Sequence, residues 1–163
     1  MGKADMFLRL EGKSTGLIKG ESNVVEHPDE IEISEWAWGM TGSTALGGSG
    51  TNVKSALKEI RFGKGTDRAT TQLMSVMRNN ELIKKAVLSV RKAGVSPPVE
   101  YLQVTLVNGR ITSLDVGTLA PGDATLTETF TIAFEEITVA YAPQESTGGK
   151  GAKLEFSARV TSN

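Results

Sequence analysis

The 163-residue sequence contains no cysteine, so it forms no disulfide and offers no thiolate for metal binding or nucleophilic attack. It contains a single histidine, His27, which is too few for a histidine-rich metal site. A Ser-His-Asp triad would have to use His27, and the polar segment 26–30 around it predicts a solvated loop instead. An enzyme is therefore the least favoured class of protein.

An excess of charge of one sign is also missing, because 18 Lys and Arg balance 19 Asp and Glu to a net charge of −1. The sequence has no basic field of the kind that gathers nucleic acid or anionic membranes. No apolar run approaches the roughly 20 residues of a membrane helix, and the N-terminal segment is too broken for a signal peptide. We expect a chain made and folded in the cytoplasm, with no nucleic-acid partner and no membrane insertion.

The remaining reactive groups form no recognisable site. The carboxylates are scattered, and a hydrolase that brings two of them together is kept only as a remote alternative. Gly63-Lys64-Gly65-Thr66 lacks the contiguous Gly-Lys-Ser/Thr of a phosphate-binding loop. The sequence assigns no catalytic residue, no cofactor and no metal.

Alternation of apolar and polar residues is the dominant pattern that is present. It runs through segments 6–11, 102–106 and 154–160, and it predicts half-buried antiparallel strands. The alternation changes phase at Ser34-Glu35 and again at Glu135-Glu136, which predicts β-bulges of the kind that bend barrel strands. We predict a mainly β, antiparallel barrel in one domain that spans residues 1–163.

One α-helix is predicted at about residues 67–79, where Thr70, Leu73, Met74 and Met77 recur at helical spacing. Met74 and Met77 are interpreted as core filler on this helix. Segment 86–92 is compatible with a helix or a strand, and its β-rich composition favours a strand.

Turns and loops are marked by glycine. Asn108-Gly109 predicts a type I′ hairpin, and Pro121-Gly122 predicts a turn. A glycine-rich loop at about residues 40–53 is longer than a hairpin needs, and such loops are usually functional or disordered. The basic pairs Lys84-Lys85 and Arg91-Lys92 are expected to be solvated.

Paired tryptophans precede this loop. Trp36 and Trp38 are two residues apart and share one face of a strand. A stacking platform for a ligand would suit them, but packing in the core or between subunits is commoner.

The order and spacing of several short motifs resemble one protein family. The motifs are Asp5-Met6-Phe7-Leu8, Lys19-Gly20-Glu21-Ser22, Trp36-Ala37-Trp38-Gly39 with the loop after it, Arg91-Lys92-Ala93-Gly94, Glu100-Tyr101-Leu102 and Leu126-Thr127-Glu128. Together they resemble the haemolysin-coregulated proteins (Hcp), the tube subunits of the type VI secretion system. The resemblance covers nearly the whole chain.

This resemblance implies a β-barrel that closes into hexameric rings with copies of itself. The rings would stack into a tube that a contractile sheath expels, and the spike and baseplate proteins would be further partners. The tube would hold and stabilise effector proteins in its lumen. Because the secretion system expels the tube itself, the chain would leave the cell without a signal peptide. Ala37 stands where the family often has a serine near the lumen.

The loop at 40–53 falls where the family has an extended loop that reaches a neighbouring subunit. The expected assembly residues are Gly42, Ser43, Thr44, Leu46, Gly47, Gly48 and Gly50. The alternative is a monomeric barrel that binds a small apolar ligand. That alternative needs an empty interior, and the apolar helix argues for a filled one.

Overall fold

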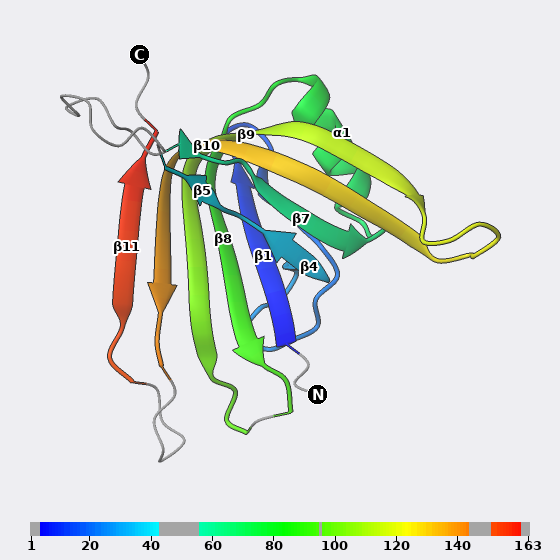
Figure 1. Cartoon of the computed structure of the whole chain (residues 1–163). Helices are drawn as coiled ribbons and strands as arrows, with labels where there is room; N and C mark the ends of the chain where they lie inside the picture. Colours follow the sequence, from blue (N-terminus) through cyan, green and yellow to red (C-terminus); the bar gives the residue numbers. More distant parts are fainter. Residues whose placement is uncertain (1–3, 43–55, 95, 144–150, 161–163) are drawn as a thin grey trace.

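A computed structural model describes residues 4–42, 56–94, 96–143 and 151–160, which form a β-structure with one helix, α1 (Thr70–Arg78) (Figure 1). The strands are β1 (Ala4–Gly12), β2 (Gly16–Ile18), β3 (Ile31–Glu32), β4 (Glu35–Ala37), β5 (Met40–Thr41), β6 (Ala56–Leu57), β7 (Ile60–Gly65), β8 (Ile83–Lys92), β9 (Glu100–Thr118), β10 (Leu126–Tyr141) and β11 (Leu154–Arg159). The prediction of a mainly β fold with a single helix is confirmed.

The main sheet curves into a barrel. Its strands follow the order β2-β1-β8-β9-β10-β7-β4, and every pair is antiparallel. Two consecutive amides then link β1 and β7, which lie near the opposite ends of this order. Ile33 donates to the Met6 carbonyl on β1 at 3.0 Å, and Ser34 donates to the Gly63 carbonyl on β7 at 2.8 Å. The sheet therefore closes on itself between β3 and β4.

The alternating apolar residues line the barrel interior, as the period-two pattern predicts. Leu8, Leu88 and Val104 lie opposite one another on β1, β8 and β9, and each is buried. The rings of Phe62 and Phe130 meet inside the barrel with centroids 5.3 Å apart. Burial of such side chains stabilises a fold by about 1.5–3 kcal/mol each, so this interior supplies most of the driving force for folding.

The helix begins three residues later than predicted, at Thr70. The Asp67 carboxylate accepts a hydrogen bond from the Ala69 amide at 2.9 Å just before it. The helix buries Thr70, Leu73 and Val76. Among the described residues, no helix is long and apolar enough to span a membrane.

The prediction that the helix methionines fill the core is wrong. Met74 and Met77 are exposed, and Val76 is buried in their place. Leu73 belongs to two possible apolar faces of the helix. One face also contains positions 70 and 76, and the other contains positions 74 and 77. Periodicity alone does not choose between them, and the packing against the barrel selects the first.

The Asn108-Gly109 hairpin is also wrong, because both residues lie within the uninterrupted strand β9. Asn108 has the positive φ of 55° that a type I′ turn requires, but here it only bends the strand. A Cβ on Gly109 would lie 2.8 Å from the Ala133 carbonyl of β10, so glycine permits the close approach of the two strands. An Asn-Gly pair is therefore compatible with an irregularity inside a strand as well as with a turn.

Neither predicted bulge lies where the sequence placed it. The β9–β10 register shifts between Thr131 and Ile132 and leaves Thr112 as the extra residue. At Glu135-Glu136 the β9–β10 register continues, but β10 changes its other partner, from β7 up to Ile132 to β11 from Glu136. The phase change at Ser34-Glu35 is the break between β3 and β4. A change of neighbour alters which face is buried as effectively as an inserted residue.

Two other local predictions are confirmed. Segment 86–92 lies in β8, so it is a strand. Pro121-Gly122 forms a turn in which the Asp123 amide donates to the Ala120 carbonyl at 3.0 Å and Gly122 has a φ of 78°. This turn closes the β9–β10 hairpin.

A fully buried ion pair joins β7, β10 and the start of α1. The Lys64 ammonium lies 2.8 Å from the Glu128 carboxylate, and both side chains are inaccessible to solvent. Asp67 lies 2.9 Å from the same ammonium, and the Thr70 hydroxyl contacts both members of the pair. The pair is therefore surrounded by hydrogen bonds, as buried charges must be.

Removing one member of this pair should destabilise the barrel strongly, because the other charge would stay buried without its partner. We expect Lys64→Met to lower the free energy of unfolding by about 3–5 kcal/mol in urea denaturation. The double variant Lys64→Met with Glu128→Leu should cost clearly less than the sum of the two single changes. Strict additivity would contradict the coupling.

An exposed ion pair that joins another β7 residue to β4 is the matched control. Arg61 and Glu35 lie 3.1 Å apart at the surface. Arg61→Met should change the free energy of unfolding by no more than about 1 kcal/mol.

Glu81, just after the helix, holds the turn between β1 and β2. Its carboxylate accepts hydrogen bonds from the Thr15 amide, the Thr15 hydroxyl and the Ser14 amide at 2.9, 2.8 and 3.1 Å. The Thr15 amide is the largest cause that holds the pKa of Glu81 below its ordinary value, against the opposing effect of desolvation. The charged form is thus favoured in the folded state.

Because the folded pKa of Glu81 is depressed, its contribution to stability is present above the unfolded glutamate pKa of about 4.3 and is lost as the pH falls through the folded pKa. We expect Glu81→Gln to unfold at lower urea concentration than the parent at pH 7. The difference should shrink in the same measurement at about pH 3. A difference that stayed constant between the two pH values would contradict this role.

Candidate functional site

Ala37 lies on the outside of the barrel, between two tryptophans that face the core. Trp36 and Trp38 are partly buried and pack against the core, as their shared face predicts. The indole of Trp38 lies 6.5 Å from the ring of Phe134, and its Nε1 donates to the Lys58 carbonyl at 2.8 Å. Ala37 between them is exposed. The tryptophans are therefore packing residues and not a stacking platform.

The surface around Ala37 is polar. The strand registers place Ala37 beside Arg61 on β7, then Thr131 on β10 and Ser113 on β9. Directly paired residues of antiparallel strands share one face, so these side chains form one outward row. We call this row, with its neighbours Glu35, Glu59 and Thr112, the polar face.

Hydroxyl groups are the main chemistry of the polar face. The Thr131 hydroxyl lies 2.7 Å from that of Thr112 and 2.6 Å from that of Ser113. The Thr112 hydroxyl also donates to Glu59 at 3.0 Å. Thr112 reaches Thr131 because it is the extra residue of the bulge, so the bulge brings two hydroxyls of β9 to one hydroxyl of β10. Such groups both donate and accept hydrogen bonds, which suits reversible contact with a polar surface.

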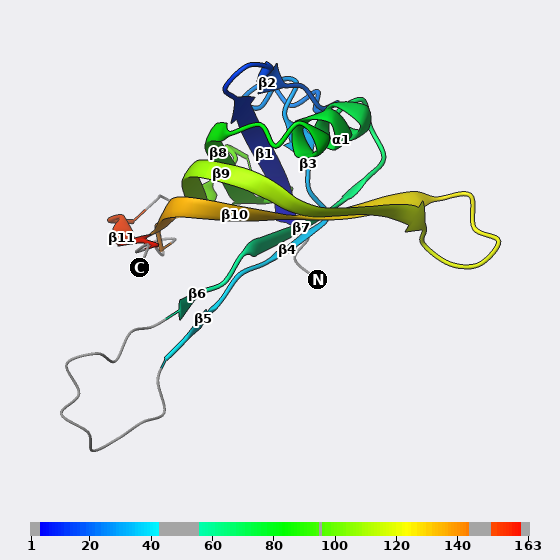
Figure 2. The same ribbon diagram turned by 90° about the horizontal axis from the view of Figure 1, so that it is seen from above.

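The expected assembly loop begins in a two-stranded arm. Met40 of β5 pairs with Leu57 of β6, and the Lys58 amide donates to the Gly39 carbonyl at 3.1 Å at the base of the arm. Figure 2 shows β5 and β6 leading away from the barrel. Of the expected assembly residues, Gly42 is described and is exposed. Ser43, Thr44, Leu46, Gly47, Gly48 and Gly50 lie outside the described residues.

His27 is not solvated, so that prediction is wrong. Its ring is buried and stacks on Phe7 with centroids 4.6 Å apart. Nδ1 lies 3.0 Å from a carboxylate oxygen of Glu30, and Nε2 contacts the carboxylate of Glu100 on β9. The segment before β3 is therefore clamped to the outside of the barrel. Sequence reasoning missed this because Glu100 lies far along the chain.

Arg91 adds to the same cluster and is buried, which corrects the prediction that it is solvated, whereas Lys92 beside it is exposed. Its guanidinium lies 5.3 Å from the centre of the Phe7 ring and contacts Asp5 at 3.4 Å and Glu26 at 3.2 Å. It therefore ties β8 to β1 and to the segment that carries His27.

The cluster around His27 has the form of a structural clamp. Within the described part of the chain, the hydrogen bonds of the His27 ring go to two carboxylates and to no hydroxyl, so no nucleophile is paired with it. The described residues also hold no cluster of three or more His, Cys, Asp or Glu that is arranged for a metal ion. The clamp holds loop to barrel, and nothing in its geometry resembles a triad.

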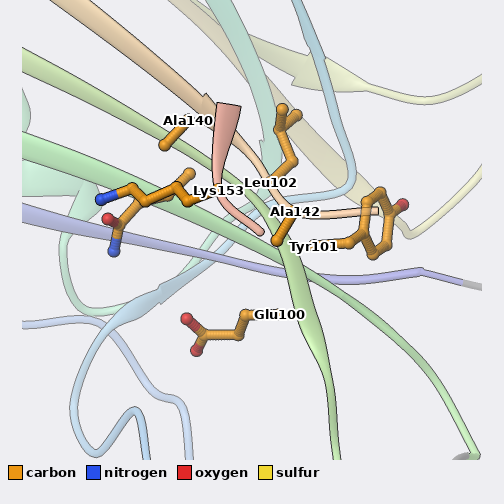
Figure 3. A pocket seen from close by; sticks show the side chains of 7 residues that line it. Glu100, Tyr101, Leu102, Ala140, Ala142 and Lys153 are labelled. Carbon is orange, nitrogen blue, oxygen red and sulfur yellow. The ribbon is translucent and has the colours of Figure 1, made fainter. Parts of the chain in front are cut away.

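A small hollow lies beside the clamp, at the start of β9. Figure 3 shows the side chains of Glu100, Tyr101 and Leu102 around it, with Ala140 near the end of β10, Ala142 just after that strand and Lys153 just before β11. A carboxylate and an ammonium thus stand at the rim of a partly apolar depression.

Comparisons with known proteins agree on one family. A family model described as "Type VI secretion system effector, Hcp" matches residues 7–141. The "Protein hcp1" of Pseudomonas aeruginosa is 34% identical over 162 residues, which cover 98% of this chain and 96% of that protein. Both matches span the barrel, the helix and the arm.

Two solved structures show the same fold. Hcp1 from Salmonella typhimurium superposes with a TM-score of 0.76 at 24% identity, over 98% of this chain and 95% of that one. A type VI secretion system effector from Yersinia pestis superposes with a TM-score of 0.74 at 26% identity, over 96% and 100%. The chain therefore belongs to the Hcp family, the secreted structural tube proteins of the type VI secretion system.

Proposed function

We propose that this chain is the subunit of a secretion tube, in which copies close into hexameric rings and the rings stack. The 34% identity to an Hcp protein over nearly the full length carries the proposal. The two-stranded arm supports it, because β5 and β6 form a separate small sheet that leads away from the barrel, which the main sheet already closes. An element that the fold does not need is suited to contact with a neighbour.

The same proposal extends to partners and location. The chain acts as one domain, residues 1–163, that assembles in the cytoplasm inside a contractile sheath and meets spike and baseplate proteins at the tube end. It is then expelled from the cell with effector proteins in the tube lumen. It acts by assembly and carriage, and not by catalysis.

The polar face is proposed as the surface that meets cargo. Ala37 contributes only a methyl group, so cargo contacts at this face come from the hydroxyls of Thr112, Ser113 and Thr131 and from the charges of Arg61 and Glu35. A wall of hydroxyls and exposed, paired charges binds weakly and reversibly, which suits a passage that must release its contents.

The alternative of a monomeric barrel for a small apolar ligand has no support in the interior. Phe62, Phe130, Leu8 and Leu88 are fully buried and fill the space between the strands. An apolar ligand would have to displace these side chains, at the cost of the core itself.

Electron microscopy of the purified protein is the direct test of ring assembly. We expect ring-shaped particles, and stacks of them at higher concentration, with matching sedimentation of the oligomer. The control is the same preparation in denaturant, which should contain monomers only. A strictly monomeric species at high concentration would overturn the proposed function.

Removal of residues 42–50 should separate folding from assembly. We expect the deletion variant to keep the circular dichroism and cooperative unfolding of the parent, because the barrel closes without this segment. Assembly measured by sedimentation should weaken. Rings and stacks that form as readily as in the parent would refute an assembly role for the loop.

A further inference from the structure

The hairpin of β9 and β10 is longer than the barrel around it. The two strands have 19 and 16 residues, and a strand of 19 residues extends to about 60 Å. In the middle of the hairpin the core-facing side chains of Leu106, Phe130 and Ile137 are buried. Toward its turn the hairpin projects beyond the other strands (Figure 1). Side chains on the core-facing side there lose their cover.

One uncovered apolar group lies at the turn of the hairpin. Val116, Leu119 and Leu126 are between 42% and 65% exposed, and we call them the hairpin patch. Val116 pairs with Glu128 and Leu126 with Thr118, in even-numbered positions that continue the core-facing row of Phe130. Two of the three residues therefore belong to the row that is buried farther along the hairpin.

A second uncovered group lies at the other end of the sheet, on β11. Tyr141, Leu154 and Phe156 are between 43% and 62% exposed, and we call them the β11 patch. Tyr141 pairs with Leu154, Val139 pairs with Phe156, and Ile137 pairs with Ala158. These pairs share the face of the buried Ile137, so β11 extends the apolar face past the edge of the core.

The two patches lie on opposite sides of the molecule. Figures 1 and 2 both place β11 at one side and the turn of the β9–β10 hairpin at the other. Single exposed apolar residues are normal, but two groups on the uncovered ends of one sheet face mark contact surfaces. Complementary patches on opposite sides suit a head-to-tail contact, which repeats in one direction and closes into a ring when its rotation closes.

We propose that the hairpin patch of one copy packs against the β11 patch of the next copy. This inference rests on the proposed assembly of the chain with itself, and it names the two surfaces that meet within the ring. In the ring, the hairpin patch of each copy is buried by one neighbour and its β11 patch is buried by the other neighbour. The occupant of both patches is a second copy of this chain.

Charge at the two patches favours the same arrangement. Asp123 lies in the hairpin turn, where the Thr125 amide donates to its carboxylate at 2.8 Å. Lys153 lies before β11 at the hollow of Figure 3, and its exposed ammonium is held only by Glu155 at 3.8 Å among the contacts described. The Asp123 carboxylate of one copy and the Lys153 ammonium of the next attract one another, which favours the contact between unlike ends.

The Thr125 amide also holds the pKa of Asp123 below its ordinary value, which favours the ionised carboxylate. The attraction to a lysine ammonium thus operates throughout the neutral range.

The absence of cysteine allows a direct test by site-specific cross-linking. We would make Leu119→Cys and Phe156→Cys as separate variants of the full chain, mix them under assembly conditions and add a short bis-maleimide. The expected product is a covalent dimer in the mixture and little dimer in either variant alone, since the contact joins unlike surfaces. A chain with both substitutions should give a ladder of oligomers on a denaturing gel.

The matched control keeps the same hairpin cysteine. Leu119→Cys mixed with Lys85→Cys should give no more dimer than either alone, because Lys85 lies on β8, outside both patches. Leu119→Asp should raise the protein concentration needed for half assembly at least about tenfold while the circular dichroism is unchanged, because the exposed side chain adds nothing to the core.

The outcomes separate this inference from the proposed function. Rings in micrographs without the cross-link between positions 119 and 156 would overturn the inference and leave tube assembly standing. Cross-linking of Phe156→Cys to Met40→Cys instead would assign the β11 patch to the neighbour's arm and also overturn it. A parent protein without any assembly would overturn the proposed function itself.

Discussion

Closure of the sheet by two consecutive amides is the constraint on which the other features depend. Ile33 bonds to β1 and Ser34 bonds to β7, so two successive peptide units link strands near the two ends of the strand order. A Cβ on Gly63 would lie 2.5 Å from Cγ of Glu35, so glycine at this position leaves room for the Glu35 side chain of β4. Closure also fixes the alternation that follows, with the tryptophans inward and Ala37 outward. The position of the polar face is thus set by the backbone before any side chain is considered.

Much of the fold follows from alternation, because a half-buried strand needs nothing more than one apolar face. The barrel was predictable for that reason, whereas the single helix was predictable from its helical spacing of apolar residues and the Pro121-Gly122 turn from its residue types. Asn108-Gly109 was not, since a positive φ at asparagine serves a bend inside one strand as well as a turn between two. The two expected bulges failed because a sequence does not record where a strand exchanges one neighbour for another.

The candidate site was predictable only in part. Glycine content marked the arm, and resemblance marked Ala37, but the hydroxyl row depends on which residues β9 and β10 set side by side. The buried charges were missed for a related reason. Lys64 finds Glu128 and His27 finds Glu100, and each pair is separated by more than sixty residues of sequence. A charged residue looks solvated until its distant partner is known.

The pairing of β1 with β8 has a consequence for the order of folding. Leu8 of β1 pairs with Leu88 of β8, which lies far along the chain. The strands β9 and β10, by contrast, are consecutive and are joined by a single turn. Local contacts close at less entropic cost than distant ones, so the hairpin can form while the barrel is still open. Its apolar side chains are then uncovered along their whole length and not only at the ends. When many copies are synthesised together, each barrel must therefore close before the exposed hairpins of two chains associate.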